Sequence, residues 1–325
     1  MLRFGVIGTN FISDHFVDAC RASGGRAEAA AVHSRTLAKA QDFAGRHGIA
    51  TAVDSLDALF DAVDAVYVAT PVGAHRPQAL AAIEAGRHVL VEKTMGASAA
   101  EVVEILHAAA AAGVVAMEAM RNVHSPVHQV IRDAINELGT VRHAHFEKLQ
   151  YSRRYDAFRA GEVLNAFDPS LGNSALADIG VYCLQPALDL FGMPRNAGGS
   201  SVFLPNGFEA GGVMYLDHGN AVVELAWSKI VAGSGPSVVH GEDAALAFDD
   251  PADMTHVTLT PRGGEPRVLW QGERQGPENS MQYEVIDFAE QVEAGASDPR
   301  WGTLSVNARA LMDAHLQASA QAGHV

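Results

Sequence analysis

Residues 1–120 alternate short apolar runs with longer segments of helical spacing, and this alternation limits the folds open to the chain. The runs predict strands over Leu2–Ile7, Ala27–His33, Ala65–Ala69, His88–Val91 and Val114–Met117. The segments between them predict helices over Ser13–Ser23, Thr36–His47, Pro77–Ala85 and Ser98–Ala112. Strands that alternate with helices pair in parallel, because each helix carries the chain back across the sheet. The sequence therefore predicts an α/β domain with a doubly wound parallel sheet over residues 1–121.

The pattern changes after Pro126. One helix is predicted over Val127–Leu138 and two more, Met281–Ala294 and Thr303–Ala322, close the chain. Between them strands follow one another without intervening helices, over Val141–Leu149, Gly211–Leu216, Ala221–Ser228, Ser237–His240, Ala245–Phe248 and Met254–Thr260. Asp217-His218-Gly219-Asn220 is a hairpin signal. These features predict an α+β domain over residues 122–325, with a large, mostly antiparallel open sheet that serves substrate binding and oligomerisation.

The bulk composition excludes several classes of partner. The 325 residues suffice for two domains, and the net charge of −15 argues against nucleic acid or an anionic membrane as a partner. No apolar stretch approaches a membrane span, and the N-terminus does not read as a signal peptide, so a soluble, cytoplasmic protein is expected. Cys20 and Cys183 form no disulfide or metal motif. His124 and His128 have the spacing of zinc ligands on a helix, but no third ligand accompanies them, and we expect no metal site.

The turn after the first strand is the first candidate cofactor site. Gly5-Val6-Ile7-Gly8-Thr9-Asn10-Phe11-Ile12-Ser13 stands where a strand passes into a helix, the place at which small residues let backbone N–H groups approach a pyrophosphate. The expected contacts are Gly8, Thr9, Asn10, Phe11 and Ile12. Asn10 replaces the usual second glycine, and we interpret it as a residue that tolerates a left-handed backbone. The alternative is an ordinary turn between a strand and a helix.

The end of the second strand bears on the choice between NAD and NADP. NAD sites usually place Asp or Glu there, but this chain has His33-Ser34-Arg35-Thr36. A hydroxyl and a guanidinium suit a 2′-phosphate, so Ser34, Arg35 and the nearby Lys39 predict NADP as the preferred cofactor, with NAD as the alternative. In the competing interpretation Ser34 and Thr36 only cap the next helix, and Arg35 is solvated.

Two later motifs resemble those of the glucose–fructose oxidoreductase / inositol dehydrogenase family. Glu92-Lys93-Thr94 resembles the family's Glu-Lys-Pro, with threonine in place of proline, and Asp178-Ile179-Gly180-Val181-Tyr182 resembles its Asp-x-Gly-x-His or Tyr. Ala69-Thr70-Pro71, His75 and Met117-Glu118-Ala119-Met120 also resemble family segments. The resemblance implies a Rossmann fold with further cofactor contacts at Thr70, Pro71, His75, Glu92, Lys93 and Glu118. The tyrosine in the second motif is most similar to the branch of dimeric dihydrodiol dehydrogenase and NADP-linked xylose dehydrogenases.

The resemblance assigns catalysis to Lys93, Tyr182 and Asp178. Hydride exchange with an alcohol requires a group that removes or supplies the hydroxyl proton. A phenol has an unperturbed pKa near 10, and a neighbouring ammonium would favour its ionised form. Lys93 and Tyr182 are therefore expected at the reacting oxygen, and Asp178 is expected to orient Lys93 or to contact a substrate hydroxyl. Without the resemblance, these residues would read as a solvated lysine, a core tyrosine and a helix cap.

The expected function is an NAD(P)-dependent oxidoreductase that acts on a sugar, a polyol or a small carbonyl compound, and that assembles as a homodimer or a dimer of dimers. Two alternatives stay open. One is a glycosidase of the same fold that uses a tightly held nicotinamide, which would release sugar without net change in NADPH. The other is a non-catalytic regulator that binds NADP as a signal.

Overall fold

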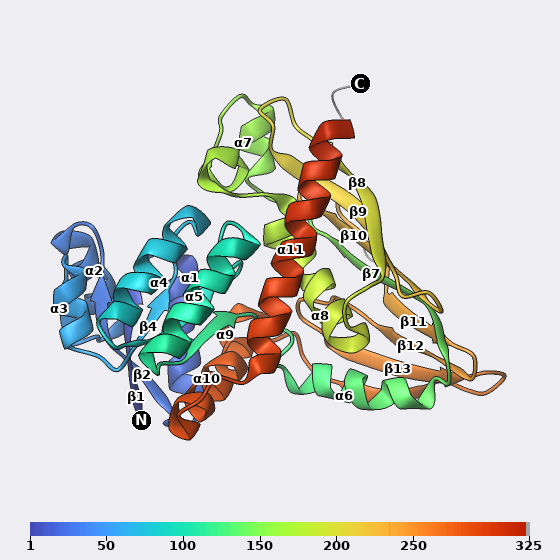
Figure 1. Ribbon diagram of the computed structural model, residues 1–325, viewed down its shortest axis with the longest axis horizontal. Coiled ribbons are helices and arrows are strands. Elements are labelled where there is room, and N and C mark those ends of the chain that lie inside the picture. Colours follow the sequence, from blue (N-terminus) through green and yellow to red (C-terminus); the bar gives the residue numbers. More distant parts are fainter. Residues whose placement is uncertain (234, 323–325) are drawn as a thin grey trace. The chain divides into compact units, whose positions relative to one another are not determined.

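A computed structural model describes residues 1–233 and 235–322 (Figure 1). The chain forms two compact units, each with its own sheet. The first unit contains Met1–His124 and Gln275–Val306, and the second contains Ser125–Arg274 and the C-terminal residues from Asn307 onward. None of the helices within the described residues is long and apolar enough to cross a membrane.

The first unit is built on a six-stranded parallel sheet, which confirms the predicted doubly wound fold. Its order is β3-β2-β1-β4-β5-β6, with β1 Leu2–Ile7, β2 Ala27–His33, β3 Thr51–Val53, β4 Ala65–Val68, β5 His88–Glu92 and β6 Ala116–Ala119. The helices are α1 Phe11–Ala22, α2 Leu37–His47, α3 Leu56–Asp61, α4 His75–Glu84, α5 Ala99–Ala112, α9 Gly276–Ser280 and α10 Gln282–Ala294. Because all strands run the same way, the turns that follow β1, β4, β5 and β6 share one edge of the sheet.

The strand β3 and the helix α3 had no counterpart among the predicted elements, and β6 lies two residues beyond the predicted Val114–Met117. Both missed elements are too short to show a periodic pattern, since β3 has three residues and α3 has six. Their place is decided by neighbours: β3 extends β2 in parallel register, and Leu59 of α3 is fully buried in the core.

The second unit is built on an eight-stranded sheet of order β14-β13-β12-β11-β7-β10-β9-β8. Its strands are β7 Val141–Leu149, β8 Asn196–Phe203, β9 Glu209–Asp217, β10 Val222–Ser228, β11 Ser237–Gly241, β12 Ala244–Phe248, β13 His256–Pro261 and β14 Arg267–Gln271. Only β7 and β10 pair in parallel, so the prediction of a mostly antiparallel sheet is confirmed, as is the hairpin between β9 and β10. The two strands absent from the prediction, β8 and β14, are the edges of the sheet, where one neighbour suffices and little apolar alternation is needed.

Helices cover one face of this second sheet. The helix α8 (Val181–Phe191) packs on β7 and β10, and α6 (Pro126–Ala134) packs on β13 and β14 (Figure 1). The remaining helical segments are α7 Tyr155–Arg159, α11 Pro299–Ala322, and the short turns η1 Val72–Ala74, η2 Ile135–Glu137, η3 Asn165–Phe167, η4 Pro169–Leu171 and η5 Leu176–Gly180. The predicted helix Val127–Leu138 is thus an α-helix that ends in a tighter turn.

Candidate active site

The turn between β1 and α1 requires glycine at position 8. Gly8 has a φ of +112°, and a Cβ atom there would lie 2.5 Å from the carbonyl oxygen of Ala69, which follows β4. The Gly8 N–H donates to the His33 carbonyl at 3.2 Å, and the Ala69 N–H donates to the Ile7 carbonyl at 2.9 Å. The ends of β1, β2 and β4 are therefore tied together with no room for a side chain, as a loop that cradles a pyrophosphate requires.

Asn10 caps the helix α1 and does not adopt a left-handed backbone. Its φ of −96° and ψ of 178° are extended, so the expected left-handed conformation is wrong. The side-chain oxygen accepts from the N–H groups of Ile12 and Ser13 at 3.0 and 3.3 Å, and its amide donates to Ala69 at 2.6 Å. Asparagine therefore serves as N-cap while holding the turn against β4. Phe11, the first residue of α1, is exposed.

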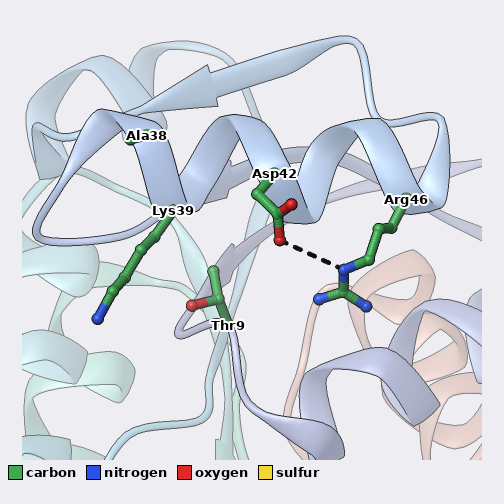
Figure 2. Close-up of a pocket in the computed structure, with 5 residues that line it drawn as sticks. All are labelled: Thr9, Ala38, Lys39, Asp42 and Arg46. Atoms are coloured by element: carbon green, nitrogen blue, oxygen red, sulfur yellow. Dashed lines mark ion pairs between the residues drawn. The ribbon is translucent and has the colours of Figure 1, made fainter.

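A pocket of about 390 Å³ opens between this turn and α2. Thr9, Ala38, Lys39, Asp42 and Arg46 line it, and Figure 2 shows the Lys39 side chain reaching from α2 toward the level of Thr9. The carboxylate of Asp42 lies 3.5 Å from Arg46, whose guanidinium also binds Asp14 at 2.7 Å. Within the described residues Lys39 has no carboxylate partner, so the pocket presents one uncommitted positive charge.

Ser34 and Arg35 occupy the connection from β2 to α2. Thr36 is the N-cap of α2 but its side chain makes no capping hydrogen bond. Arg35 is exposed and, in the part of the chain that the structure describes, pairs with no carboxylate. The Thr36 hydroxyl therefore does not make the capping hydrogen bond that the competing interpretation expected, whereas the exposed Arg35 fits both interpretations.

The turn after β5 carries Lys93 and is held from several sides. The Glu92 carboxylate accepts from the Tyr67 hydroxyl at 2.5 Å and from the backbone N–H of Lys93. The Met95 N–H donates to Glu118 of β6 at 2.7 Å. The peptide bond between Lys93 and Thr94 is cis. Glu92 and Glu118, predicted as cofactor contacts, thus hold the Lys93 turn in this structure.

His75, at the start of α4, joins the turn after β4 to the Lys93 turn. It is buried, and its ring nitrogens lie 2.7 Å from the carbonyl oxygen of Thr70 and 2.9 Å from that of Thr94. Burial lowers the pKa of His75, although both carbonyls oppose that shift. A neutral imidazole has one N–H, so it donates to one of these two oxygens at a time. Thr70, Pro71, His75 and Lys93, all predicted as cofactor contacts, thereby lie at one edge of the sheet.

The second motif lies in the other unit, at the entry to α8. Asp178 is in the π-helical turn η5, and Tyr182 is partly exposed in the first turn of α8. Position 180, between them, requires glycine because a Cβ atom there would lie 2.9 Å from Cγ of Trp227. The buried Glu209 holds both neighbours, since it accepts from the Leu176 N–H at 2.7 Å and from the Trp227 indole at 2.8 Å.

Lys229 is a candidate functional residue that sequence reasoning missed. Its ammonium lies 2.8 Å from the Asp178 carboxylate, donates to the Ala166 carbonyl at 3.0 Å, and faces the rings of Phe167 and Phe208. The expectation for Asp178 named Lys93 or a substrate hydroxyl as its partner, and the structure gives it Lys229. The available signal was a lysine directly after the predicted strand Ala221–Ser228. Its burial is known only from the structure.

His124 and His128, considered as zinc ligands, each pair with a carboxylate instead. His124 lies 2.7 Å from Asp287 in the first unit, and His128 lies 2.8 Å from Asp189 in the second. Among the described residues no group of His, Cys, Asp and Glu has the geometry of a metal site.

A parallel doubly wound sheet with a glycine turn and a capped α1 at one edge is the architecture of a dinucleotide-binding domain. The chain belongs to the Gfo/Idh/MocA family, whose model, described as an oxidoreductase family with an NAD-binding Rossmann fold, matches residues 2–120. It is therefore an NAD(P)-dependent dehydrogenase or reductase.

Three comparisons describe its relatives. The scyllo-inositol 2-dehydrogenase (NADP(+)) IolU of Bacillus subtilis (strain 168) is 37% identical over 290 residues, which is 89% of this chain and 87% of that protein. The uncharacterized oxidoreductase YgjR of Escherichia coli (strain K12) is 35% identical over 291 residues, 89% of this chain and 88% of that one. The structure of levoglucosan dehydrogenase with NADH and levoglucosan has a TM-score of 0.88 at 18% identity, covers 98% of this chain and 97% of its own, and shows the fold.

The assignment to the dihydrodiol and xylose dehydrogenase branch needs correction. Trans-1,2-dihydrobenzene-1,2-diol dehydrogenase of Mus musculus is 30% identical over 60% of this chain, and the D-xylose 1-dehydrogenase (NADP(+)) 2 of Haloferax volcanii is 34% identical over 59%. IolU and YgjR are more similar over more of the chain. A single tyrosine in the second motif was too small a feature to place the chain within the family.

Proposed function

We propose that this protein is an NADP-preferring dehydrogenase or reductase of a cyclic polyol or a sugar. The observation that carries the proposal is the Lys93 turn, which Glu92, Glu118 and His75 hold at the same edge of the sheet as the glycine turn. The similarity to an NADP-linked scyllo-inositol dehydrogenase supports a polyol substrate. In this proposal residues 1–121 bind the cofactor, and residues 122–325 supply substrate binding and assembly.

The proposed chemistry divides between two residues. A bound nicotinamide supplies hydride transfer to or from a carbon atom. Tyr182 carries the hydroxyl proton of the substrate, and the Lys93 ammonium stabilises negative charge on the reacting oxygen. Asp178, whose side chain pairs with Lys229 and is 46% exposed, binds a substrate hydroxyl. A polyol suits such a site, because it offers hydroxyls beside the one that reacts.

The substrate class is tested by a panel of inositols, aldoses and small alcohols, each with NADP⁺, and of the corresponding ketones with NADPH. We expect turnover, followed by NADPH absorbance, with at least one inositol or sugar and none with simple alcohols. Sugar release from a glycoside without net change in NADPH would instead identify a glycosidase. Tight NADP binding without turnover of any panel member would identify a regulator.

Preference for NADPH over NADH is a separate prediction. Arg35 and Lys39 are exposed near the pocket at α2, and a 2′-phosphate would give each a charge-assisted hydrogen bond. We expect Arg35→Ala or Lys39→Ala to weaken NADPH binding about 10-fold to 100-fold, the range for bonds to a charged group. NADH binding should stay within about twofold of wild type, as judged by fluorescence titration.

Arg46→Ala is the matched control for these variants. Arg46 lines the same pocket, but Asp14 and Asp42 already hold its guanidinium, so its loss should change NADPH binding less than the loss of Lys39. Equal affinity of the wild type for the two cofactors, or a preference for NADH, would contradict the assignment.

A homodimer through the second sheet is the next prediction. The exposed apolar residues of β8, β9 and β10 are Val202, Phe203, Val213, Tyr215 and Val222. In Figure 1 the helices α6 and α8 lie against one face of this sheet. Exposed apolar side chains on neighbouring strands need a partner, and a second copy offers the same surface.

Light scattering at micromolar concentration should therefore give at least twice the chain mass of 34.3 kDa. Val213→Asp would bury a charge at the interface. We expect it to raise the dissociation constant of the dimer at least about tenfold, which corresponds to ~1.4 kcal/mol. Met193→Asp, an exposed apolar residue between α8 and β8, is the control and should leave the mass unchanged. A wild-type protein with the mass of one chain would refute the prediction.

A further inference from the structure

A group of ionisable side chains lies behind the Lys93 turn in the first unit, and the proposed function leaves its most buried member unused. Tyr67 of β4, Glu92 of β5, Glu118 of β6 and Arg121 beyond β6 interact there with Glu284 of α10. Glu284 is 1% exposed. A carboxyl group brought by the C-terminal part of the chain thus lies in the core beside the end of β5.

The three carboxyl groups of this cluster differ in the hydrogen bonds that they accept. Glu92 accepts from the Tyr67 hydroxyl and from the Lys93 N–H, and Glu118 accepts from the Met95 N–H. Among the described residues, Oε2 of Glu284 accepts no hydrogen bond and is shielded from solvent. A buried carboxylate oxygen without a donor is costly, whereas a protonated carboxyl group is neutral. The donors therefore favour a charge on Glu92 and a proton on Glu284.

Electrostatics favour the same arrangement. Burial and the nearby Glu92 hold the pKa of Glu284 well above its usual range, Arg121 opposes the shift, and Glu118 adds to it. Burial also raises the pKa of Glu92, but Lys93 and the Tyr67 hydroxyl oppose it. Burial and Glu92 raise the pKa of Tyr67, so it stays a phenol and donates.

A further titratable neighbour of the cluster is Cys20 of α1, which interacts with Tyr67. Burial raises the pKa of the Cys20 thiol, so it stays uncharged and adds no ion to the cluster.

We propose that Glu284 keeps a proton in the folded protein and, through its electrostatic interaction with Glu92, sets the charge next to Lys93. Glu284 is then a positioning residue for Lys93, and this role rests on the proposed catalytic function of Lys93. When alkaline pH removes this proton, a second anion lies near Glu92. That charge repels the carboxylate that holds the Lys93 N–H, and it also stabilises the Lys93 ammonium.

The pH dependence of folding tests the proton without any assay of activity. A carboxyl group whose pKa is raised in the folded state contributes stability below the unfolded pKa, about 4.3 for glutamate, and loses it as pH rises through the folded value. The melting temperature of the wild-type protein should therefore fall as the pH rises above the unfolded pKa of glutamate, in part through Glu284. Glu284→Gln is neutral throughout this range, so its melting temperature should fall less.

Two further variants keep the melting comparison decisive. Glu290→Gln, on the same helix, removes an exposed carboxylate that lies 3.1 Å from Arg26, and it should keep the pH dependence of wild type. Glu284→Met carries no titrating group and no amide, so it replaces Glu284→Gln if the glutamine variant does not fold. Equal pH dependence in wild type and the position-284 variants would show that Glu284 holds no proton and would overturn the proposal.

The pH profile of turnover tests the action on Lys93. The alkaline limb of kcat should move toward acid by about half a pH unit or more in Glu284→Gln, because the variant cannot supply the second anion that stabilises the ammonium. Glu290→Gln should leave the limb in place, and KM for NADPH should stay within about twofold in both variants. If Glu284→Gln flattens the pH dependence of the melting temperature but leaves the alkaline limb of kcat in place, Glu284 does not position Lys93. Full turnover of Lys93→Met would refute the proposed function instead, and the melting comparison would still decide the protonation of Glu284.

Discussion

Lys93→Met and Tyr182→Phe are each expected to lower turnover by about 10²–10⁴-fold, the usual effect of removing a positioned acid or base. Lys93→Met removes the ammonium but roughly keeps the length of the side chain, and Tyr182→Phe removes only the hydroxyl. Both groups act when charge shifts on the substrate oxygen. Cofactor affinity should therefore change far less than kcat, because the proposed pyrophosphate and 2′-phosphate contacts lie at the glycine turn and at α2.

The double variant shows whether the two residues act together. If they form one functional unit, Lys93→Met with Tyr182→Phe should be scarcely slower than the slower single variant. If the fold-losses of turnover in the two single variants instead multiply in the double variant, each residue acts independently. Turnover of Tyr182→Phe within a factor of about three of wild type would rule out Tyr182 as the proton carrier, and Lys93 would become the leading candidate.

Gly8→Ala is expected to weaken NADPH binding about 100-fold, equivalent to ~2.7 kcal/mol. The new Cβ atom would lie 2.5 Å from the Ala69 carbonyl oxygen, which belongs to the backbone and cannot move without disturbing the end of β4. The left-handed φ of +112° adds strain for any residue with a side chain. The loop must therefore shift, and its N–H groups no longer point toward the proposed position of the pyrophosphate.

Gly24→Ala is the control that separates backbone strain from the steric clash of the new Cβ atom. Gly24 also has a positive φ, of +68°, but a Cβ atom there meets nothing within 4 Å. Its variant should lose about 1–2 kcal/mol of folding stability from the backbone alone, with NADPH binding unchanged. Isothermal titration and thermal melting measure the two effects. Wild-type affinity in Gly8→Ala would show that the turn after β1 does not hold the cofactor.

The expectations for Asn10 and Asp178 show where sequence reasoning reaches its limit. Asn10 was interpreted through its backbone tolerance, whereas the structure uses its side chain as the cap of α1 and as a bond to Ala69. Asp178 was expected to orient Lys93 or to contact a substrate hydroxyl, and the structure pairs it with Lys229, 51 positions later in the chain. In both cases a contact that sequence reasoning did not anticipate comes from a distant segment, Ala69 for Asn10 and Lys229 for Asp178.

The sequence by itself determined the parallel sheet of the first unit, the mostly antiparallel sheet of the second and the family, because these depend on local periodicity and on short motifs. It also singled out Glu92-Lys93-Thr94 as a candidate site. Only the tertiary structure decided that Tyr67, Glu92, Glu118 and Glu284 surround the Lys93 turn, and that β8 and β14 form the edges of the second sheet. The physical reason is that burial, hydrogen bonding and charge depend on neighbours in space, and the chain brings Glu284 to Glu92 from almost two hundred residues away.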